Sequence, residues 1–258
     1  MTGQRTKPIL RWQGGKSRML KEIMPLIKPH VCYCEPFFGG GAVLFAKERS
    51  STEVINDVNG NLVALYRNLQ FHLPALVNEL DWLFASRQNL HDFIQQPGLT
   101  ELQRAARFLL VNRTSFGGNM NSFGVSKTKG GGVGLKHKPM KELLQAAHER
   151  LDGVVVENIS YERIFKNYDS ADTQFFIDPP YENATNGAYA GWDQNRLAAF
   201  AREVRRLKGN WIVTLNDSEF TRKLFSGHKI QPITSRNGAI NVRTHGQQMF
   251  GELLITKK

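Results

Sequence analysis

The sequence predicts a doubly wound α/β core that is interrupted by an inserted helical domain. A glycine cluster, Gly39-Gly40-Gly41, stands between a short apolar run and a segment of helical composition. A second apolar run directly precedes Asp178-Pro179-Pro180-Tyr181, and residues 73–112, between these landmarks, have helical spacing without a strand. We expect residues 1–70 and 150–258 to form the core and residues 71–149 the insertion, a division that 258 residues can support.

The first part of the core reads as strand, glycine turn, helix and strand, the order of a nucleotide-binding unit. The apolar residues 31–34 predict a buried strand that stops at Glu35-Pro36, and residues 42–49 have helical composition. Residues 53–57 predict the next strand and residues 61–69 the next helix.

The insertion changes character along its length. Its first part predicts helices, because apolar residues recur at helical spacing from residue 73 to 112. Residues 114–139 are rich in glycine, asparagine, serine and lysine, which predicts a loop or hairpin. A further helix is expected over residues 140–151.

The second part of the core resumes the α/β pattern. Strands are expected at residues 154–156, 174–177 and 211–215, with a helix from about 194 to 207 that ends at Gly209. A last pair of strands at 229–233 and 252–256 would close the edge of the sheet.

Composition favours a polyanionic partner and argues against several other classes. The formal net charge is +11 with a pI near 9.8. Cys32 and Cys34 are too close to bridge and too few for a zinc site, so we expect buried, reduced thiols and no metal. No stretch approaches the roughly 20 apolar residues of a membrane span, and no secretory signal precedes Arg11. We therefore expect a cytoplasmic protein with no membrane partner.

The glycine cluster and Asp57 together predict a cofactor that contains adenosine. Glycines between a strand and a helix let a ligand approach the backbone. Asp57 ends the next strand, at the distance where an acidic residue holds ribose hydroxyls in such folds. The alternative is that the glycines make only a tight turn and that Asp57 caps a helix.

The tetrapeptide Asp178-Pro179-Pro180-Tyr181 is the strongest chemical signal. It follows a buried strand, at the end where ligands of open α/β sheets bind. The prolines remove amide donors, leaving the Asp178 carboxylate and the Pro179 carbonyl as acceptors. An adenine amino group needs both N–H bonds held while its nitrogen attacks, and Tyr181 would stack on the extruded base. The alternative is a turn that merely ends a strand.

The motifs, taken in order, resemble those of the Dam-type DNA adenine-N6 methyltransferases, the D12 class of the alpha group. The matching segments are Leu10 to Lys16, Glu35 to Gly41, Asn56 to Asn59, Leu109 to Arg113 and Phe176 to Tyr181. The resemblance implies a Rossmann-like S-adenosylmethionine-dependent methyltransferase core with an inserted helical DNA-recognition domain. It also implies transfer of a methyl group to the N6 amine of a flipped adenine in double-stranded DNA, with S-adenosylhomocysteine as product.

The resemblance implies a cofactor site in which Trp12 and Lys16 meet the methionine portion and Asp57 binds the ribose. Lys16 could pair with the cofactor carboxylate, and Trp12 could offer a ring face to the sulfonium. The full expected set is Trp12, Lys16, Glu35, Phe37, Gly39, Gly41, Asp57, Val58, Ser160, Tyr161 and Asp178. Gly14-Gly15-Lys16 is not a phosphate loop, because Leu10 stands where that loop requires its first glycine.

A long stretch of one charge sign predicts the surface that faces DNA. No acidic residue occurs between Glu101 and Glu142, an interval with eight lysines and arginines. A flexible, solvated loop is the alternative reading. An apolar side chain here could fill the gap beside the flipped base. The expected DNA contacts are Arg113, Phe116, Asn119, Met120, Asn121, Lys127, Lys129, Lys136 and Lys138.

The target sequence does not carry over from the family. GATC-methylating relatives have a tyrosine and then an arginine shortly after the Asn-Arg pair, whereas this chain has Thr114 to Asn121. Asn119 or Asn121 could pair with adenine, but no arginine stands ready for guanine. Arg236 and Arg243, in the late loop, either hold the backbone around the flipped base or form a surface hairpin.

Other functions remain open at this level. Methylation of the cytosine N4 amine poses the same chemical problem, and a catalytically inactive DNA-binding protein could keep the fold. The core also serves methyltransferases of RNA or protein. We expect a monomer in solution, either a restriction-modification enzyme or a phage or cellular methyltransferase.

Overall fold

The computed structural model describes residues 5–128, 132–182, 189–236 and 249–258, which fall into two compact units. The helical unit comprises Met1–Gly15, Gly39–Glu48 and Asn59–Val156. The sheet unit comprises Lys16–Phe38, Arg49–Val58 and Glu157–Lys258. Each unit is therefore assembled from segments that lie far apart in the sequence.

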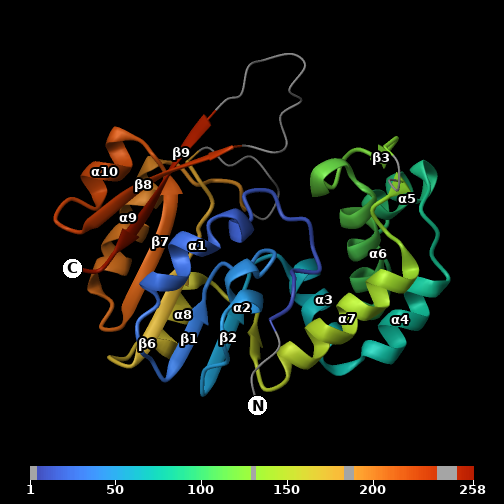
Figure 1. Ribbon diagram of the computed structural model, residues 1–258, viewed down its shortest axis with the longest axis horizontal. Helices are drawn as coiled ribbons and strands as arrows, with labels where there is room; N and C mark the ends of the chain where they lie inside the picture. The colour runs from blue at the N-terminus through green and yellow to red at the C-terminus, as the bar shows by residue number, and fades with distance from the viewer. Residues whose placement is uncertain (1–4, 129–131, 183–188, 237–248) are drawn as a thin grey trace. The chain divides into compact units, whose positions relative to one another are not determined.

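A largely parallel sheet forms the frame of the sheet unit (Figure 1). Its strands follow the order β2-β1-β6-β7-β9-β8. β1 is parallel to β2 and β6, and β6 to β7, whereas β9 runs antiparallel to β7 and β8. The strands are β1 (Cys32–Glu35), β2 (Thr52–Asn56), β6 (Thr173–Ile177), β7 (Asn210–Asn216), β8 (Lys229–Arg236) and β9 (Met249–Thr256). The carboxyl ends of the four parallel strands consequently meet at one end of the sheet, where ligands of such folds bind.

Helices α8 (Tyr161–Tyr168) and α9 (Gln194–Arg206) cover one face of this sheet. Alternate strand residues point to them because side chains in a strand alternate with a period of two. Phe175 and Ile177 of β6 and Val213 of β7 share one buried cluster with Ile164 of α8 and Phe200 of α9. The remaining elements of the sheet unit are η1 (Lys16–Arg18), α1 (Leu20–Ile23), η2 (Met24–Leu26) and α10 (Glu219–Leu224).

Helix α6 (Glu101–Thr114) is the centre of the helical unit and packs against α3 (Gly60–Phe71), α4 (Leu73–Asp81) and α5 (Arg87–Gln95). It begins at a capping box in which Thr100 Oγ1 accepts from the Gln103 amide at 3.1 Å and the Gln103 side chain accepts from the Thr100 amide. α3 and α4 also pack against α7. The other elements are α2 (Ala42–Ala46), η3 (Phe116–Gly118), β3 (Val125–Ser126), β4 (Gly132–Val133), α7 (His137–Leu151) and β5 (Val155–Glu157).

The fold class predicted from the sequence is confirmed, and the helical stretch, the hairpin and the last strand pair lie where they are expected. The expected helix over 42–49 is too long, because Lys47 takes an extended backbone and α2 ends at Ala46. Cys34 is buried but Cys32, which opens β1, is only partly so; both are free thiols. The compact units do not follow the expected boundaries, since α3 packs with α6 and α7.

Helix α8 has no counterpart among the elements predicted from the sequence. Its apolar residues Tyr161, Ile164, Phe165 and Tyr168 nevertheless recur at helical spacing, and the first three are buried. This spacing is the signal that a closer reading of the sequence could have used.

Candidate active site

Strand β6 delivers Asp178 to the ligand-binding end of the sheet. All five residues of β6 are buried, and Pro179 after Asp178 is buried as well. Asp178 Oδ1 accepts hydrogen bonds from Thr214 Oγ1 at 2.5 Å and from Lys16 Nζ at 2.9 Å. Within the described part of the chain, no hydrogen bond reaches Asp178 Oδ2. The carboxylate is thus fixed through one oxygen and presents the other.

The ammonium of Lys16 is surrounded by Asp178, Tyr181 and Glu252, and these four residues with Thr214 form a polar cluster. Its side chain is 3% exposed, and Nζ lies 3.2 Å from the Tyr181 hydroxyl and 3.7 Å from Glu252 Oε2. Burial alone lowers the pKa of Lys16, but the charges of Asp178, Tyr181 and Glu252 outweigh it and raise the pKa. Burial, and then the charge of Asp178, raises the pKa of Tyr181. Lys16 is therefore a cation that faces the tetrapeptide, and the contact with the cofactor that the family resemblance implies for it stays a prediction.

Thr214 and Glu252 belong to this cluster and were missed by the sequence-based reading. Thr214 is a fully buried polar residue within an apolar strand, a signal that such a residue has a partner. Glu252 opposes Asn216 in the antiparallel pairing of β7 and β9, and its side chain is 13% exposed. Burial raises the pKa of Glu252, with a further rise from Asp178 and an opposing effect of Lys16. A second carboxylate therefore shares the ammonium of Lys16.

Asp57 directly follows strand β2, as Asp178 directly follows strand β6. It is buried, and its Oδ1 accepts a hydrogen bond from the Tyr189 hydroxyl at 2.8 Å. Its backbone carbonyl accepts from Asn158 Nδ2 at 2.7 Å. The carboxylate is thus held beside the end of β1, where the sequence predicts the ribose to bind.

Asn56, which precedes Asp57, ties the neighbouring loops together and was also missed. Its Nδ2 donates to the Pro36 carbonyl at 2.8 Å, and its Oδ1 accepts from the Ile159 amide at 2.9 Å. Its carbonyl accepts from the Phe38 amide at 2.8 Å. A buried side-chain amide with both ends satisfied fixes the loops after β1 and before α8.

An aromatic cavity opens beside Asp57 in the sheet unit. Phe37 lies 5.5 Å from Tyr161 and 5.7 Å from Trp192 between ring centroids, and Arg196 lies 5.0 Å above the Trp192 ring. Four expected cofactor residues line this cavity, together with Tyr189 and Trp192: Phe37, Val58, Ser160 and Tyr161. Such walls with a carboxylate nearby suit a planar base joined to a ribose.

Glu35 and the glycine turn make contacts within the fold that the sequence does not predict. Glu35 is buried and accepts a hydrogen bond from the Tyr33 hydroxyl at 2.8 Å. Gly39 and Gly41 have φ values of +49° and +69°. In the helical unit a Cβ on Gly39 would lie 2.6 Å from the Trp12 indole nitrogen. Trp12 therefore occupies the space over Gly39, and both this packing and the positive φ require glycine there.

The basic stretch of the helical unit is partly used inside the fold. Arg104 donates to the Leu99 carbonyl, Arg107 donates to the Gln96 carbonyl, and Lys141 pairs with Asp81 at 2.7 Å. The lysines expected to meet DNA that are described, Lys127, Lys136 and Lys138, are exposed. Lys129 lies outside the described residues, as does Arg243, while Arg236 ends β8.

The Asn112-Arg113 pair holds the N-terminal segment on α6. Asn112 is fully buried, and its side-chain amide bonds both the amide and the carbonyl of Arg11, at 2.9 and 3.0 Å. Arg113 donates to the carbonyls of Gly134 and Ile9. Burial, together with repulsion from Arg11, lowers the pKa of Arg113 to about 10, so the guanidinium stays charged at neutral pH. The pair thus has a structural role that the sequence does not reveal.

The loop from Thr114 to Gly124 closes on itself and presents Phe116. Its ends are joined by the Gly124 amide and the Thr114 carbonyl at 2.8 Å. Asn119 Oδ1 accepts from the amides of Asn121 and Ser122, which commits its side chain to a turn. Phe116 is 54% exposed, and Met120 has a φ of +62°. Among the expected base-contacting residues, Phe116 and Asn121 are the ones left exposed.

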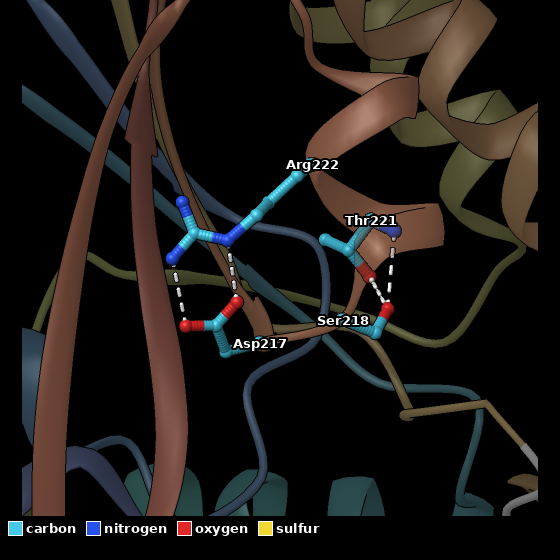
Figure 2. Close-up of polar contacts among 4 residues, drawn as sticks. All are labelled: Asp217, Ser218, Thr221 and Arg222. Carbon is cyan, nitrogen blue, oxygen red and sulfur yellow. Dashed lines mark hydrogen bonds and ion pairs between the residues drawn. The ribbon is translucent and has the colours of Figure 1, made fainter.

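The loop after β7 is fixed by polar contacts (Figure 2). Arg222 donates from Nε and Nη2 to the two carboxylate oxygens of Asp217, at 2.7 and 2.8 Å, which lowers the pKa of Asp217. Ser218 caps α10 by accepting from the Thr221 amide at 3.1 Å. The Asp217 amide donates to the Gly251 carbonyl at 2.9 Å. The first two sets of contacts fix the turn from β7 into α10, and the last one continues the pairing of β7 with β9.

The described residues contain neither a membrane-crossing helix nor a metal-binding cluster. No helix there is long and apolar enough to cross a membrane. No group of three or more histidine, cysteine, aspartate or glutamate side chains in the same residues is placed to hold a metal ion.

Comparison with known proteins decides the family. The profile of the D12 class N6 adenine-specific DNA methyltransferases matches residues 12–237. The chain belongs to this family. It is 28% identical to a DNA adenine methylase of Haemophilus influenzae, over 88% of this chain and 85% of that protein. It is 26% identical to the type II methyltransferase M.CviBI of Paramecium bursaria Chlorella virus NC1A, over 86% and 87% of the two chains.

Family membership makes this chain an adenine-specific DNA methyltransferase, an enzyme that methylates the N6 amine of adenine. The cytosine-N4 and inactive alternatives are not favoured. A solved rRNA methyltransferase, AviRa of Streptomyces viridochromogenes, has 11% identity and a TM-score of 0.41, over 98% of this chain and 86% of that one.

Proposed function

We propose that the enzyme takes the methyl group from S-adenosylmethionine and transfers it to an adenine flipped out of double-stranded DNA. The observation that carries this proposal is the Asp178 carboxylate at the end of a buried strand, which is held through Oδ1 and whose Oδ2 accepts no hydrogen bond from the described residues. When bound, the cofactor supplies an electrophilic methyl on a sulfonium, and S-adenosylhomocysteine is the product.

The residues around Asp57 fit an adenosine. Phe37 and Tyr161 form aromatic walls, and the buried Asp57 carboxylate can accept from ribose hydroxyls. Trp12, Glu35, Gly39, Gly41, Val58 and Ser160 complete the proposed cofactor set. Binding there orients the reactive methyl group, which is the main contribution that a protein makes to a direct transfer.

The chain's own residues prepare the target amine. Asp178 Oδ2 and the Pro179 carbonyl accept its two N–H bonds, so the nitrogen lone pair leaves the ring system and points at the methyl group. Pro180 holds the backbone direction, and Tyr181 stacks on the base, a contact worth about 1–3 kcal/mol per base. Asp178 lastly accepts the proton that the methylated amine must lose.

We expect the gap beside the flipped base to be filled by side chains of one loop, namely Phe116, Met120 and Asn121. Asn119 closes the turn of this loop. The proposed phosphate-facing cations of residues 71–149 are Lys127, Lys129, Lys136 and Lys138, whereas Arg113, also expected there, is committed to the carbonyls of Gly134 and Ile9. We propose a monomer that acts in a restriction-modification pair, in line with the type II names of several relatives. The free thiols of Cys32 and Cys34 fit a reducing compartment such as the cytoplasm.

The deciding experiment incubates the purified protein with labelled S-adenosylmethionine and unmethylated genomic DNA, then maps modified bases by single-molecule sequencing. We expect N6-methyladenine in one short motif. Asp178→Ala should abolish transfer and leave the cofactor dissociation constant nearly unchanged. Transfer that prefers RNA over duplex DNA, or an active Asp178→Ala variant, would refute the proposal.

A further inference from the structure

The cluster around Lys16 contains one more acidic group than the proposed chemistry uses. Asp178 accepts the target amine in our proposal, and Lys16 balances its charge. Glu252 lies on a different strand, and its Oε2 is 3.7 Å from the same Lys16 Nζ. Its side chain is 13% exposed, so this second carboxylate is held out of water at a cost that needs a reason.

Lys16 connects Glu252 to two residues of the tetrapeptide. Lys16 Nζ bonds Asp178 Oδ1 at 2.9 Å and the Tyr181 hydroxyl at 3.2 Å. Because that hydroxyl accepts from Lys16, its own proton remains to be donated. Glu252 therefore acts on both Asp178 and Tyr181 through the Lys16 ammonium that they share.

The strand pairing explains why Glu252 stands at this place. β9 pairs with β7 so that Glu252 opposes Asn216, two residues after Thr214 on β7. Side chains two apart on a strand share a face, so the β7–β9 pairing puts Glu252 beside the face from which Thr214 bonds Asp178. The bond from the Asp217 amide to the Gly251 carbonyl continues this pairing, and Arg222 holds the Asp217 side chain (Figure 2).

We propose that Glu252 is a positioning residue for methyl transfer, whose charge keeps the Lys16 ammonium from pairing with Asp178 alone. With Glu252 charged, Lys16 is shared between two carboxylates, and Asp178 remains a strong acceptor for the target amine. With Glu252 neutral, Lys16 turns wholly to Asp178 and weakens it as an acceptor. This inference rests on the proposed function of the same site.

The test compares Glu252→Gln with the unmodified chain in single-turnover methyl transfer across acid and neutral pH. The titratable groups of the described residues that face Glu252 are Lys16, Asp178 and Tyr181, and both proteins contain them. Their titrations therefore largely cancel in the ratio of the two rates. Burial raises the pKa of Glu252, so the ratio should be near one at low pH and rise through that pKa to about 10- to 100-fold.

Three further measurements separate positioning from a structural role. The dissociation constants of S-adenosylmethionine and DNA should stay within about threefold in Glu252→Gln, since a loss in rate alone is expected. Glu252→Asp keeps the charge and should retain the pH-dependent rise that Gln loses, which carries the test if Gln impairs folding. Glu203→Gln, on the exposed side of α9, is the matched control and should behave as the unmodified chain.

The outcomes are distinct. No transfer by the unmodified chain overturns the proposed function and this inference with it. Transfer by the unmodified chain with a rate ratio that is flat in pH, or equal losses in binding and rate, overturns the inference alone. A rising ratio with preserved binding supports it.

Discussion

Thr214→Val tests how Asp178 is held in the active site. The substitution removes one hydroxyl and keeps the branched shape, so the fully buried position on β7 stays filled. It deletes the 2.5 Å hydrogen bond to Asp178 Oδ1. Hydrogen bonds to charged groups contribute about 1.5–3 kcal/mol. Asp178 keeps its bond to Lys16 and is 23% exposed, so we take the lower value.

A loss of about 1.5 kcal/mol in transition-state stabilisation corresponds to roughly a tenfold slower transfer. We expect that loss in single-turnover rate with excess enzyme, while the dissociation constant of S-adenosylmethionine stays unchanged. Thr173→Val is the matched control. Thr173 is equally buried, lies at the opposite end of β6, and donates to the Tyr168 carbonyl at 2.7 Å. An unchanged rate in Thr214→Val, or an equal loss in Thr173→Val, would refute the reasoning.

Three other predictions concern the cofactor and DNA. Asp57→Ala should raise the dissociation constant of S-adenosylmethionine, measured by calorimetry, and an unchanged constant would remove the ribose role. Tyr189→Phe should lower that constant about 3- to 10-fold, because the ribose no longer competes with a phenol for Asp57 Oδ1; equal or weaker binding would contradict this. Replacing Lys127 and Lys138 together by alanine should reduce the salt dependence of DNA binding by about two charges, and an unaltered slope would exclude phosphate contacts there.

The sequence predicted the residues that stand in contiguous motifs and missed those that reach the same place from other strands. Asp178 and Asp57 are recognisable because each follows a buried strand. Thr214 comes beside Asp178 only because β6 and β7 pair with Ile177 opposite Val213. A shift of one residue would turn Thr214 to the other face. Such registers depend on contacts between distant segments, which a reading of local patterns does not contain.

Local patterns also do not show why a residue in a motif is constrained. The glycine cluster predicts that a ligand approaches the backbone at Gly39, and in the structure Trp12 fills the space over this residue. Asn112 was noted within a family motif, and its role is to hold Arg11 on α6. A motif therefore marks a constrained position, but only the packing shows whether the constraint comes from a ligand or from the fold.

In the basic stretch, contacts within the fold reduce the number of side chains that can bind DNA. Charge along the chain counts every lysine and arginine alike, but Arg104, Arg107 and Lys141 already have partners within the fold. The asparagines divide in the same way, since the side chain of Asn119 closes its own turn while Asn121 stays exposed. Base reading by this loop, in our proposal, therefore depends on an asparagine suited to adenine and not on an arginine suited to guanine. Such a loop has no evident means of selecting the guanine of GATC, so we expect a different target sequence.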